Sequence, residues 1–230
     1  DKTINQPITI IAGDGSEWSP RNSGKNHIGE EVTLRWGLTT SNNWISAYVI
    51  SQLTTPKQFA NILRSFGLRG EIVPDYSLCL GPCEVSVAEM VDAYTTFPNK
   101  GIRINPIYVT RIEDNNGNLI ASFTPTTTEV INEETSYKMI NMLTSVMDHG
   151  TGVRVRYKYN MQAPAGCKTG TTQNNSDGWF IGFTPTLVSG VWVGWEDRGV
   201  HFSSMAEGQG ASMALPIWAK YMNKVLQDST

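Results

Sequence analysis

The last third of the chain carries the pattern that most restricts the fold. Three short runs that favour extended structure follow one another, and Asn, Asp, Pro and Gly separate them. The runs cover 167–172, 178–184 and 187–195, and a final helical pattern begins near Pro216. Helical patterns dominate the middle of the chain. We therefore expect an α+β fold in which an antiparallel sheet packs against helices.

Helix-start signals are frequent in the middle of the chain. Thr55 can cap a helix, Pro56 suits the first helical position, and Gln58 completes a capping box. A second capping box, made by Ser86 and Glu89, precedes a one-sided apolar stripe that indicates core packing. Further helices are expected over 33–40, 44–53 and 132–148.

Two other segments carry turn signals. The runs 107–113 and 118–123 flank Asn116-Gly117, a pair that favours the tight turn of a β-hairpin. The first thirty residues are rich in turn formers and hold a single apolar stretch. We expect them to form a surface loop that is entered from a segment upstream.

Composition excludes several classes of protein. Of 230 residues, 40% are hydrophobic and 17% are charged, which excludes a disordered polymer. The net charge is −3, so no overall positive field recruits nucleic acid or anionic lipid. No apolar run approaches the length that crosses a bilayer, and the first ten residues lack the basic and apolar regions of a signal peptide.

Cysteine and histidine give no sign of a metal centre. The three histidines are far apart, and none has metal-ligand spacing to a cysteine. We therefore expect neither a metal nor a cofactor. Cys79 and Cys83 flank Gly81-Pro82, where a turn could let them form a disulfide, but two small residues packed at a loop explain the pattern equally well. Cys167 has no obvious partner.

The segment from Lys168 to Thr172, KTGTT, is the most informative stretch. It lies on or beside a predicted strand, and Gly170 leaves room for another backbone to approach. A lysine and two hydroxyls suit an extended peptide that ends in a carboxylate: the peptide adds as a strand, and Lys168, Thr169 and Thr171 receive its negative end. A surface turn is the alternative. The segment is not a phosphate-binding loop, because the upstream glycine of that motif is missing.

A second polar group, Ser41-x-Asn43, lies between two predicted helices. The Ser41 hydroxyl could relay a proton, and the Asn43 amide could bind a peptide carbonyl. A simple helix cap explains the same residues. Ser41 and Lys168 are far apart in the chain, so only a shared fold can bring the two groups together.

These two motifs occur in the order of the second and third signatures of serine β-lactamases and penicillin-binding proteins. The surrounding sequence is more specific. Over most of its length the chain resembles the transpeptidase domain of class A, bifunctional, penicillin-binding proteins, whose fold is an antiparallel sheet packed with helices. The resemblance rests on the stretches WSPRN, GEEVTLRWGLTTSNN, EVSVAEMVDAYTTFPNKG, HGTGVRVR, GCKTGTTQNNSDGWFIGFTP, LVSGVWVGWED and GQGASMALPIW.

The resemblance implies a mechanism. In that family a serine attacks the bond between two terminal D-alanines of a peptidoglycan stem peptide, and an amine of a neighbouring stem resolves the acyl-enzyme. By resemblance, Ser41 passes a proton to the leaving amine and Asn43 holds the substrate backbone. Lys168 supplies positive potential, Thr169 and Thr171 bind the carboxylate, and the Thr171 N–H forms half of an oxyanion hole. β-Lactams, which imitate D-Ala-D-Ala, are implied ligands.

The chain departs from the family in one respect. No serine is followed three positions later by lysine, so the S-x-x-K nucleophile motif is absent. We expect residues 1–230 to be a single partial transpeptidase domain, truncated before Asp1. A longer protein would carry the nucleophile, a glycosyltransferase domain and a membrane anchor that holds the domain outside the cytoplasm. The isolated chain is then expected not to react with penicillin and to be only marginally stable.

Two related functions remain as alternatives. A serine β-lactamase hydrolyses the acyl-enzyme instead of transferring it, and the matches over 84–101 and 178–195 argue against that class. A penicillin-sensing domain would be acylated once in order to signal. Asp177, Trp179 and the loop Gly150-Thr151-Gly152 are interpreted as supporting structure.

Overall fold

The computed structural model describes residues 1–228. Its centre is a three-stranded antiparallel sheet in the order β11-β10-β9, formed by β9 (Gly166–Thr171), β10 (Gly178–Phe183) and β11 (Val188–Val193). Ile181 of β10 pairs with Lys168 of β9. The three predicted strands and the α+β class are therefore confirmed, and β9 forms a free edge of the sheet among the described residues.

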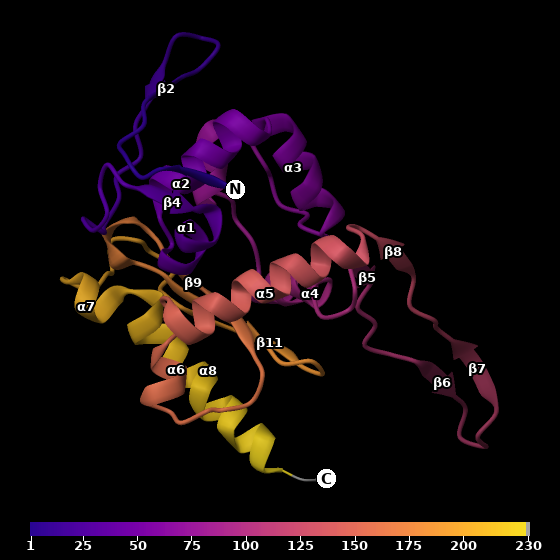
Figure 1. The fold of residues 1–230 in the computed structure, drawn as a ribbon. Coiled ribbons are helices and arrows are strands. Elements are labelled where there is room, and N and C mark those ends of the chain that lie inside the picture. Colours follow the sequence, from indigo (N-terminus) through magenta and orange to yellow (C-terminus); the bar gives the residue numbers. More distant parts are fainter. Residues whose placement is uncertain (229–230) are drawn as a thin grey trace.

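Different helices cover the two faces of the sheet (Figure 1). On one face Phe180 and Trp218 of α8 (Gly210–Gln227) are fully buried, with ring centroids 4.9 Å apart. A Cβ at Gly182 would meet the Trp218 ring at 2.3 Å, so glycine lets α8 pack this closely. On the opposite face, a Cβ at Gly190 would meet Val91 of α4 (Val87–Thr95) at 2.8 Å.

Helix α5 (Glu133–His149) packs against β9, and α1 (Leu34–Thr40) packs against α5. Arg35 fixes this second contact. Its guanidinium donates to the Asn141 carbonyl at 2.9 Å and to the Ser145 hydroxyl at 2.8 Å. The helix predicted over 132–148 is confirmed, and Asn132 caps it by accepting from the Thr135 N–H.

A second core cluster, distinct from the one that contains Phe180 and Trp218, lies around Ile50, Leu68 and Leu78. Its residues come from α4 and from the segments η1 (Val49–Leu53), α3 (Pro56–Ser65) and η2 (Tyr76–Leu80), together with the loops between them. Helix α2 (Asn43–Tyr48) leads directly into η1. The capping box of Ser86 and Glu89 is complete. At α3 only half of the predicted box forms, because the Gln58 side chain accepts from the Thr55 hydroxyl instead of the cap backbone.

Cys79 and Cys83 are both free thiols packed against this second cluster. Burial raises the pKa of Cys79 to about 12 and raises that of Cys83 as well. Cys167, in the main core, is also free, and burial raises its pKa to about 12. These thiols stay protonated at neutral pH, which makes them poor nucleophiles.

The first thirty residues are more ordered than the predicted loop. Three of their segments are strands: β1 (Lys2–Ile4) pairs antiparallel with β4 (Glu31–Thr33), which follows directly, and β2 (Ile10–Ile11) pairs with β3 (Glu17–Trp18). Asn5 is fully buried, and its amide donates to two carbonyls of the turn at 26–27. This long-range bonding decides the conformation and is invisible in the local turn signals.

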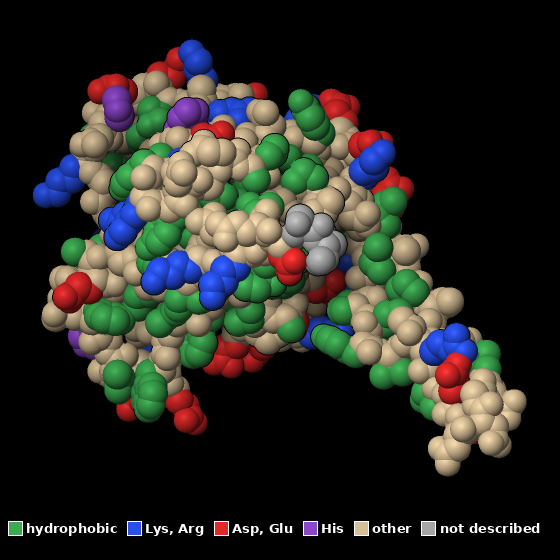
Figure 2. Space-filling model, turned by 90° about the horizontal axis from the view of Figure 1, so that it is seen from below, with side chains coloured by type: hydrophobic (Ala, Val, Ile, Leu, Met, Phe, Trp, Pro, Cys, Tyr) green, Lys and Arg blue, Asp and Glu red, His purple; other side chains and the backbone are tan. Residues whose placement is uncertain are grey.

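The predicted hairpin forms an arm that projects from the body of the molecule (Figures 1 and 2). Its outer part pairs β6 (Arg111–Glu113) with β7 (Leu119–Ser122), and its base pairs β5 (Ile102–Ile104) with β8 (Thr127–Glu129). The turn is longer than predicted. The Asp114 carboxylate accepts from the N–H groups of Asn116 and Asn118 and closes a wider loop.

The end of the chain differs from the prediction in one respect. Helix α8 begins at Gly210 instead of near Pro216, and Pro216 lies inside it. Burial of Ala211, Ala214 and Trp218 offsets the hydrogen bond that proline removes. Four short helical turns were not predicted from the sequence: η2, α6 (Arg154–Tyr157), η3 (Gln173–Asn175) and α7 (Met205–Gly208). Within residues 1–228, no helix is both long and apolar enough to cross a membrane.

Candidate active site

Two groups that are distant in the sequence meet at the free edge of the sheet. The Lys168 ammonium donates to the Ser41 hydroxyl at 2.8 Å and to the Thr169 carbonyl at 2.7 Å. Lys168 is half-buried, and burial lowers the pKa of its ammonium to about 8. A lysine with this pKa is still mostly protonated at neutral pH, yet it titrates close to the physiological range.

The junction between α1 and α2 holds Ser41 in an unusual backbone conformation. Ser41 has a φ of 55°, and its N–H bonds back to the last turn of α1. Asn42 is buried, caps α2 through Ile45 and donates to Asn5. A Cβ at Gly37 would meet Ile45 at 2.4 Å, so the two short helices pack tightly around the junction. Ser41 is thereby left exposed while its neighbour serves as the cap.

The end of α1 is anchored beside β9 by the loop Gly150-Thr151-Gly152. A Cβ at Gly150 would meet the Thr39 carbonyl oxygen at 2.2 Å, and one at Gly152 would meet the Cys167 sulfur at 2.3 Å. The Thr151 N–H donates to the Thr39 carbonyl at 3.3 Å. Because both glycines lack a side chain, the loop can lie between α1 and β9. It contacts Thr39, two residues before Ser41, and Cys167, one residue before Lys168.

The two threonines of the motif each have a protein partner. The Thr169 and Thr151 hydroxyls are 2.7 Å apart, and either can be the donor. The Thr171 hydroxyl accepts from the Gly210 N–H at the start of α8, at 3.0 Å. A Cβ at Gly170 would meet the Trp179 Cβ at 3.0 Å, which is tight but not a severe clash.

The turn after β9 is fixed by Asp177, which is buried. Its carboxylate accepts from the Thr172 and Ser176 hydroxyls at 2.9 Å and from the Trp192 indole at 3.1 Å. These bonds join the end of β9 to β11. Asp177 therefore supports the end of the strand that carries the motif.

Asn43 is oriented differently from the other predicted site residues. Its amide donates to the Arg21 carbonyl at 2.7 Å, and its N–H donates to the Asn22 side chain at 3.1 Å. The structure thus brings Ser41, Lys168, Thr169 and Thr171 to one edge, while the Asn43 amide is bound to the opening segment.

Sequence reasoning interpreted Thr151 only as part of a supporting loop, and it did not name Gly210. A hydroxyl between two glycines in Gly150-Thr151-Gly152 was the only available signal for the first. Gly210 contributes a backbone N–H, which no residue-type pattern reveals. Among residues 1–228, no group of three or more His, Cys, Asp or Glu side chains is arranged to hold a metal ion.

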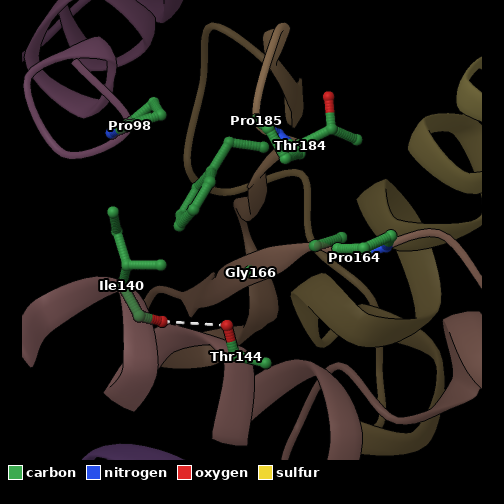
Figure 3. Close-up of a pocket in the computed structure, with 9 residues that line it drawn as sticks. Pro98, Ile140, Thr144, Pro164, Gly166, Thr184 and Pro185 are labelled. Atoms are coloured by element: carbon green, nitrogen blue, oxygen red, sulfur yellow. Dashed lines mark hydrogen bonds between the residues drawn. The ribbon is translucent and has the colours of Figure 1, made fainter. Parts of the chain in front are cut away.

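A pocket of about 200 Å³ lies elsewhere, at the beginning of β9 (Figure 3). Its lining is mainly apolar and includes Ile140, Pro164, Phe183 and Pro185. Thr144 points toward it, but the Thr144 hydroxyl is bound to the Ile140 carbonyl at 2.9 Å. None of the predicted site residues lines this pocket.

Comparison with known proteins assigns the chain to a family. Residues 1–194 match the family model of the penicillin binding protein transpeptidase domain. The chain belongs to this family. Both motifs lie within the matched residues, whereas α7 and α8 follow them. The predicted family is therefore confirmed.

Curated relatives of the chain include penicillin-binding proteins 1A. The chain is 33% identical over 214 residues to that of Aquifex aeolicus (strain VF5), a match that covers 92% of the chain and 28% of the relative. It is 32% identical over 223 residues to the penicillin-binding protein 1A of Neisseria meningitidis serogroup B (strain ATCC BAA-335 / MC58). This match covers 93% of the chain and 27% of the relative. The chain thus spans less than a third of the length of these relatives.

Solved structures agree with the fold over the whole chain. Penicillin-Binding Protein 1A from Haemophilus influenzae superposes with a TM-score of 0.87 at 25% identity, covering 100% of this chain and 39% of the other. The penicillin-binding protein PonA1 from Mycobacterium tuberculosis gives a TM-score of 0.83 at 21% identity. This match covers 100% of this chain and 63% of the PonA1 chain. The similarity includes α8, which lies outside the residues matched to the family model.

Proposed function

We propose that this chain is the part of a serine D,D-transpeptidase that holds the donor substrate during peptidoglycan cross-linking. The observation that carries the proposal is the 2.8 Å bond between Lys168 and Ser41 at the free edge of β9, in a chain of this family. The free edge suits an extended peptide that adds as a further strand, here a stem peptide that ends in D-Ala-D-Ala.

The proposed roles follow from charge and hydrogen-bond direction. The positive charge of Lys168 attracts the terminal carboxylate, and the Thr169 and Thr171 hydroxyls bind it. The Thr172 N–H donates to the Asp177 carbonyl across the turn. Because N–H directions alternate along a strand, the Thr171 N–H is directed to the free edge, where it can serve as half of an oxyanion hole.

Ser41 and Asn43 complete this half of the site. Ser41 accepts from Lys168, so its own proton is free for exchange with the leaving amine. Asn43 would hold the backbone of the substrate once its amide exchanges the Arg21 carbonyl for a peptide carbonyl. β-Lactams would occupy the same subsite, since they present a carboxylate next to a reactive carbonyl.

The nucleophile is proposed to come from outside residues 1–230, because no serine here precedes a lysine by three positions. In this proposal the chain is one part of a transpeptidase domain in a longer protein. That protein also carries a glycosyltransferase domain and an N-terminal anchor that holds the enzyme on the outer side of the cytoplasmic membrane. Residues 1–230 alone are then inactive.

Labelling with a fluorescent penicillin tests this proposal. The isolated chain should acquire no covalent label, whereas the longer protein with its S-x-x-K segment should be labelled at that serine. Thr171→Val in the longer protein should slow labelling by about tenfold, because one bond to a charged group is lost. Labelling of the isolated chain, or none of the longer protein, would show that the proposal is wrong.

A further inference from the structure

The hydroxyls at the edge of β9 share a pattern of hydrogen-bond direction. Ser41 accepts from the Lys168 ammonium, and Thr171 accepts from the Gly210 N–H. An ammonium and a backbone N–H can only donate, so the direction of both bonds is fixed. Each of these hydroxyls therefore keeps its own hydrogen available for an outside acceptor.

Thr169 is the exception, because its partner is another hydroxyl. The Thr151 and Thr169 oxygens are 2.7 Å apart, and the bond can run in either direction. If Thr169 donates to Thr151, its hydrogen is used inside the protein. If Thr151 donates to Thr169, the Thr169 hydrogen is free, as those of Ser41 and Thr171 are.

A carboxylate selects between these two arrangements, since it can only accept. It accepts from the Thr169 hydroxyl only when Thr151 donates to Thr169, so that Thr169 can donate to the carboxylate. Successive bonds of this kind polarise one another, and the charged end strengthens them. In this arrangement the half-buried Thr151 hydroxyl is the donor to the Thr169 oxygen. Removal of that hydroxyl would leave the Thr169 oxygen without this donor when the carboxylate binds.

We propose that Thr151 is a positioning residue that orients the Thr169 hydroxyl toward the carboxylate of the substrate. The inference rests on the proposed function, because it takes that carboxylate as the ligand. The loop Gly150-Thr151-Gly152 was interpreted from the sequence as supporting structure. The inference gives it a direct part in substrate binding as well.

The geometry of the loop explains why this residue can act at both motifs. The close approaches at Gly150 and Gly152 exclude a Cβ and fix Thr151 between α1 and β9. The Thr151 N–H donates to the carbonyl of Thr39, two residues before Ser41. The Thr151 hydroxyl is bonded to the hydroxyl of Thr169, the residue after Lys168. A substitution of the Thr151 side chain leaves the N–H bond to Thr39 in place. The contribution of the hydroxyl can therefore be measured separately from that of the backbone bond.

The test uses the longer protein that carries this chain and measures the second-order rate constant of acylation by penicillin. Thr151→Val keeps the shape and removes the hydroxyl, and we expect about a three- to tenfold loss, carried by weaker initial binding. Thr151→Ser should restore most of the rate. Thr144→Val is the matched control, because Thr144 is also half-buried but bonds within α5, and it should leave the rate unchanged.

A double-substitution cycle distinguishes positioning from general loosening of the loop. With Thr169→Val present, Thr151→Val should have little further effect, because the hydroxyl that it orients is gone. An equal loss in both backgrounds would overturn the inference, as would acylation of Thr151→Val at the unaltered rate. If the unsubstituted longer protein is not acylated, the proposed function itself fails.

Discussion

At the scale of single residues, the site depends on one lysine held in a partly desolvated position. Lys168 bonds to one hydroxyl and one carbonyl, and neither partner carries a charge. Burial therefore lowers its pKa without an opposing carboxylate. A carboxylate beside Lys168 would supply the opposite charge, so this position favours an anionic ligand.

The lowered pKa predicts a measurable titration. In the isolated chain, the Lys168 side chain should titrate near pH 8 by NMR of its Cε, against 10.5 for an ordinary lysine. Between these values the unfolded chain holds more protons than the folded chain. The contribution of Lys168 to stability should therefore rise with pH from about 8 to 10.5, and Lys168→Met should remove that rise. A midpoint near 10.5 would contradict the burial that we describe.

At the scale of elements, close approaches at glycines decide how the helices and strands meet. Gly182 admits the Trp218 ring of α8 on one face of the sheet, and Gly150 admits the end of α1 near β9. Neither glycine needs a positive φ for its role. Their importance comes from the space that the missing side chain leaves.

Gly182→Ala tests the contact between β10 and α8. The added Cβ would meet the fully buried Trp218 ring at 2.3 Å, so the ring or the helix must shift. Overpacking of this kind costs about 1–3 kcal/mol in free energy of unfolding, measurable by urea denaturation. Gly13→Ala is the control, since nothing lies within 4 Å of its Cβ, and it should change stability by less than about 0.5 kcal/mol. Equal effects would rule out the close packing of α8.

At the scale of the whole molecule, the described chain leaves part of its sheet incompletely covered. Every residue of β11 is half-buried or exposed, and Trp192 is 40% exposed, although β10 beside it is mostly buried. The face shown in Figure 2 carries lysine, arginine and acidic side chains interspersed, in keeping with a net charge of −3.

This incomplete cover allows a test of the longer protein that we propose. If its further segments cover β11, the isolated chain should have a lower urea midpoint than the longer protein and should bind a dye for exposed apolar surface more strongly. Equal midpoints for the two proteins would argue that residues 1–230 form a self-sufficient unit.

The sequence by itself determined the local elements and the family. Capping residues and apolar periodicity act within a few residues, so the helices at Pro56, Val87 and Glu133 and the three strands could be predicted closely. The start of α8 could not, because burial of α8 outweighs the local signal of Pro216. The opening segment was mistaken for a loop because the hydrogen bonds of Asn5 to residues 26–27 are long-range and leave no local signal.

Only the tertiary structure decided how the site is assembled. The sequence named Ser41 and Lys168 as candidates, but their 2.8 Å contact depends on α1, α5 and β9 packing together. The link through Thr151 and the orientation of Asn43 toward Arg21 likewise join residues far apart in the chain. Residue types fix which hydrogen bonds a side chain can make, whereas long-range packing decides which partner lies within reach.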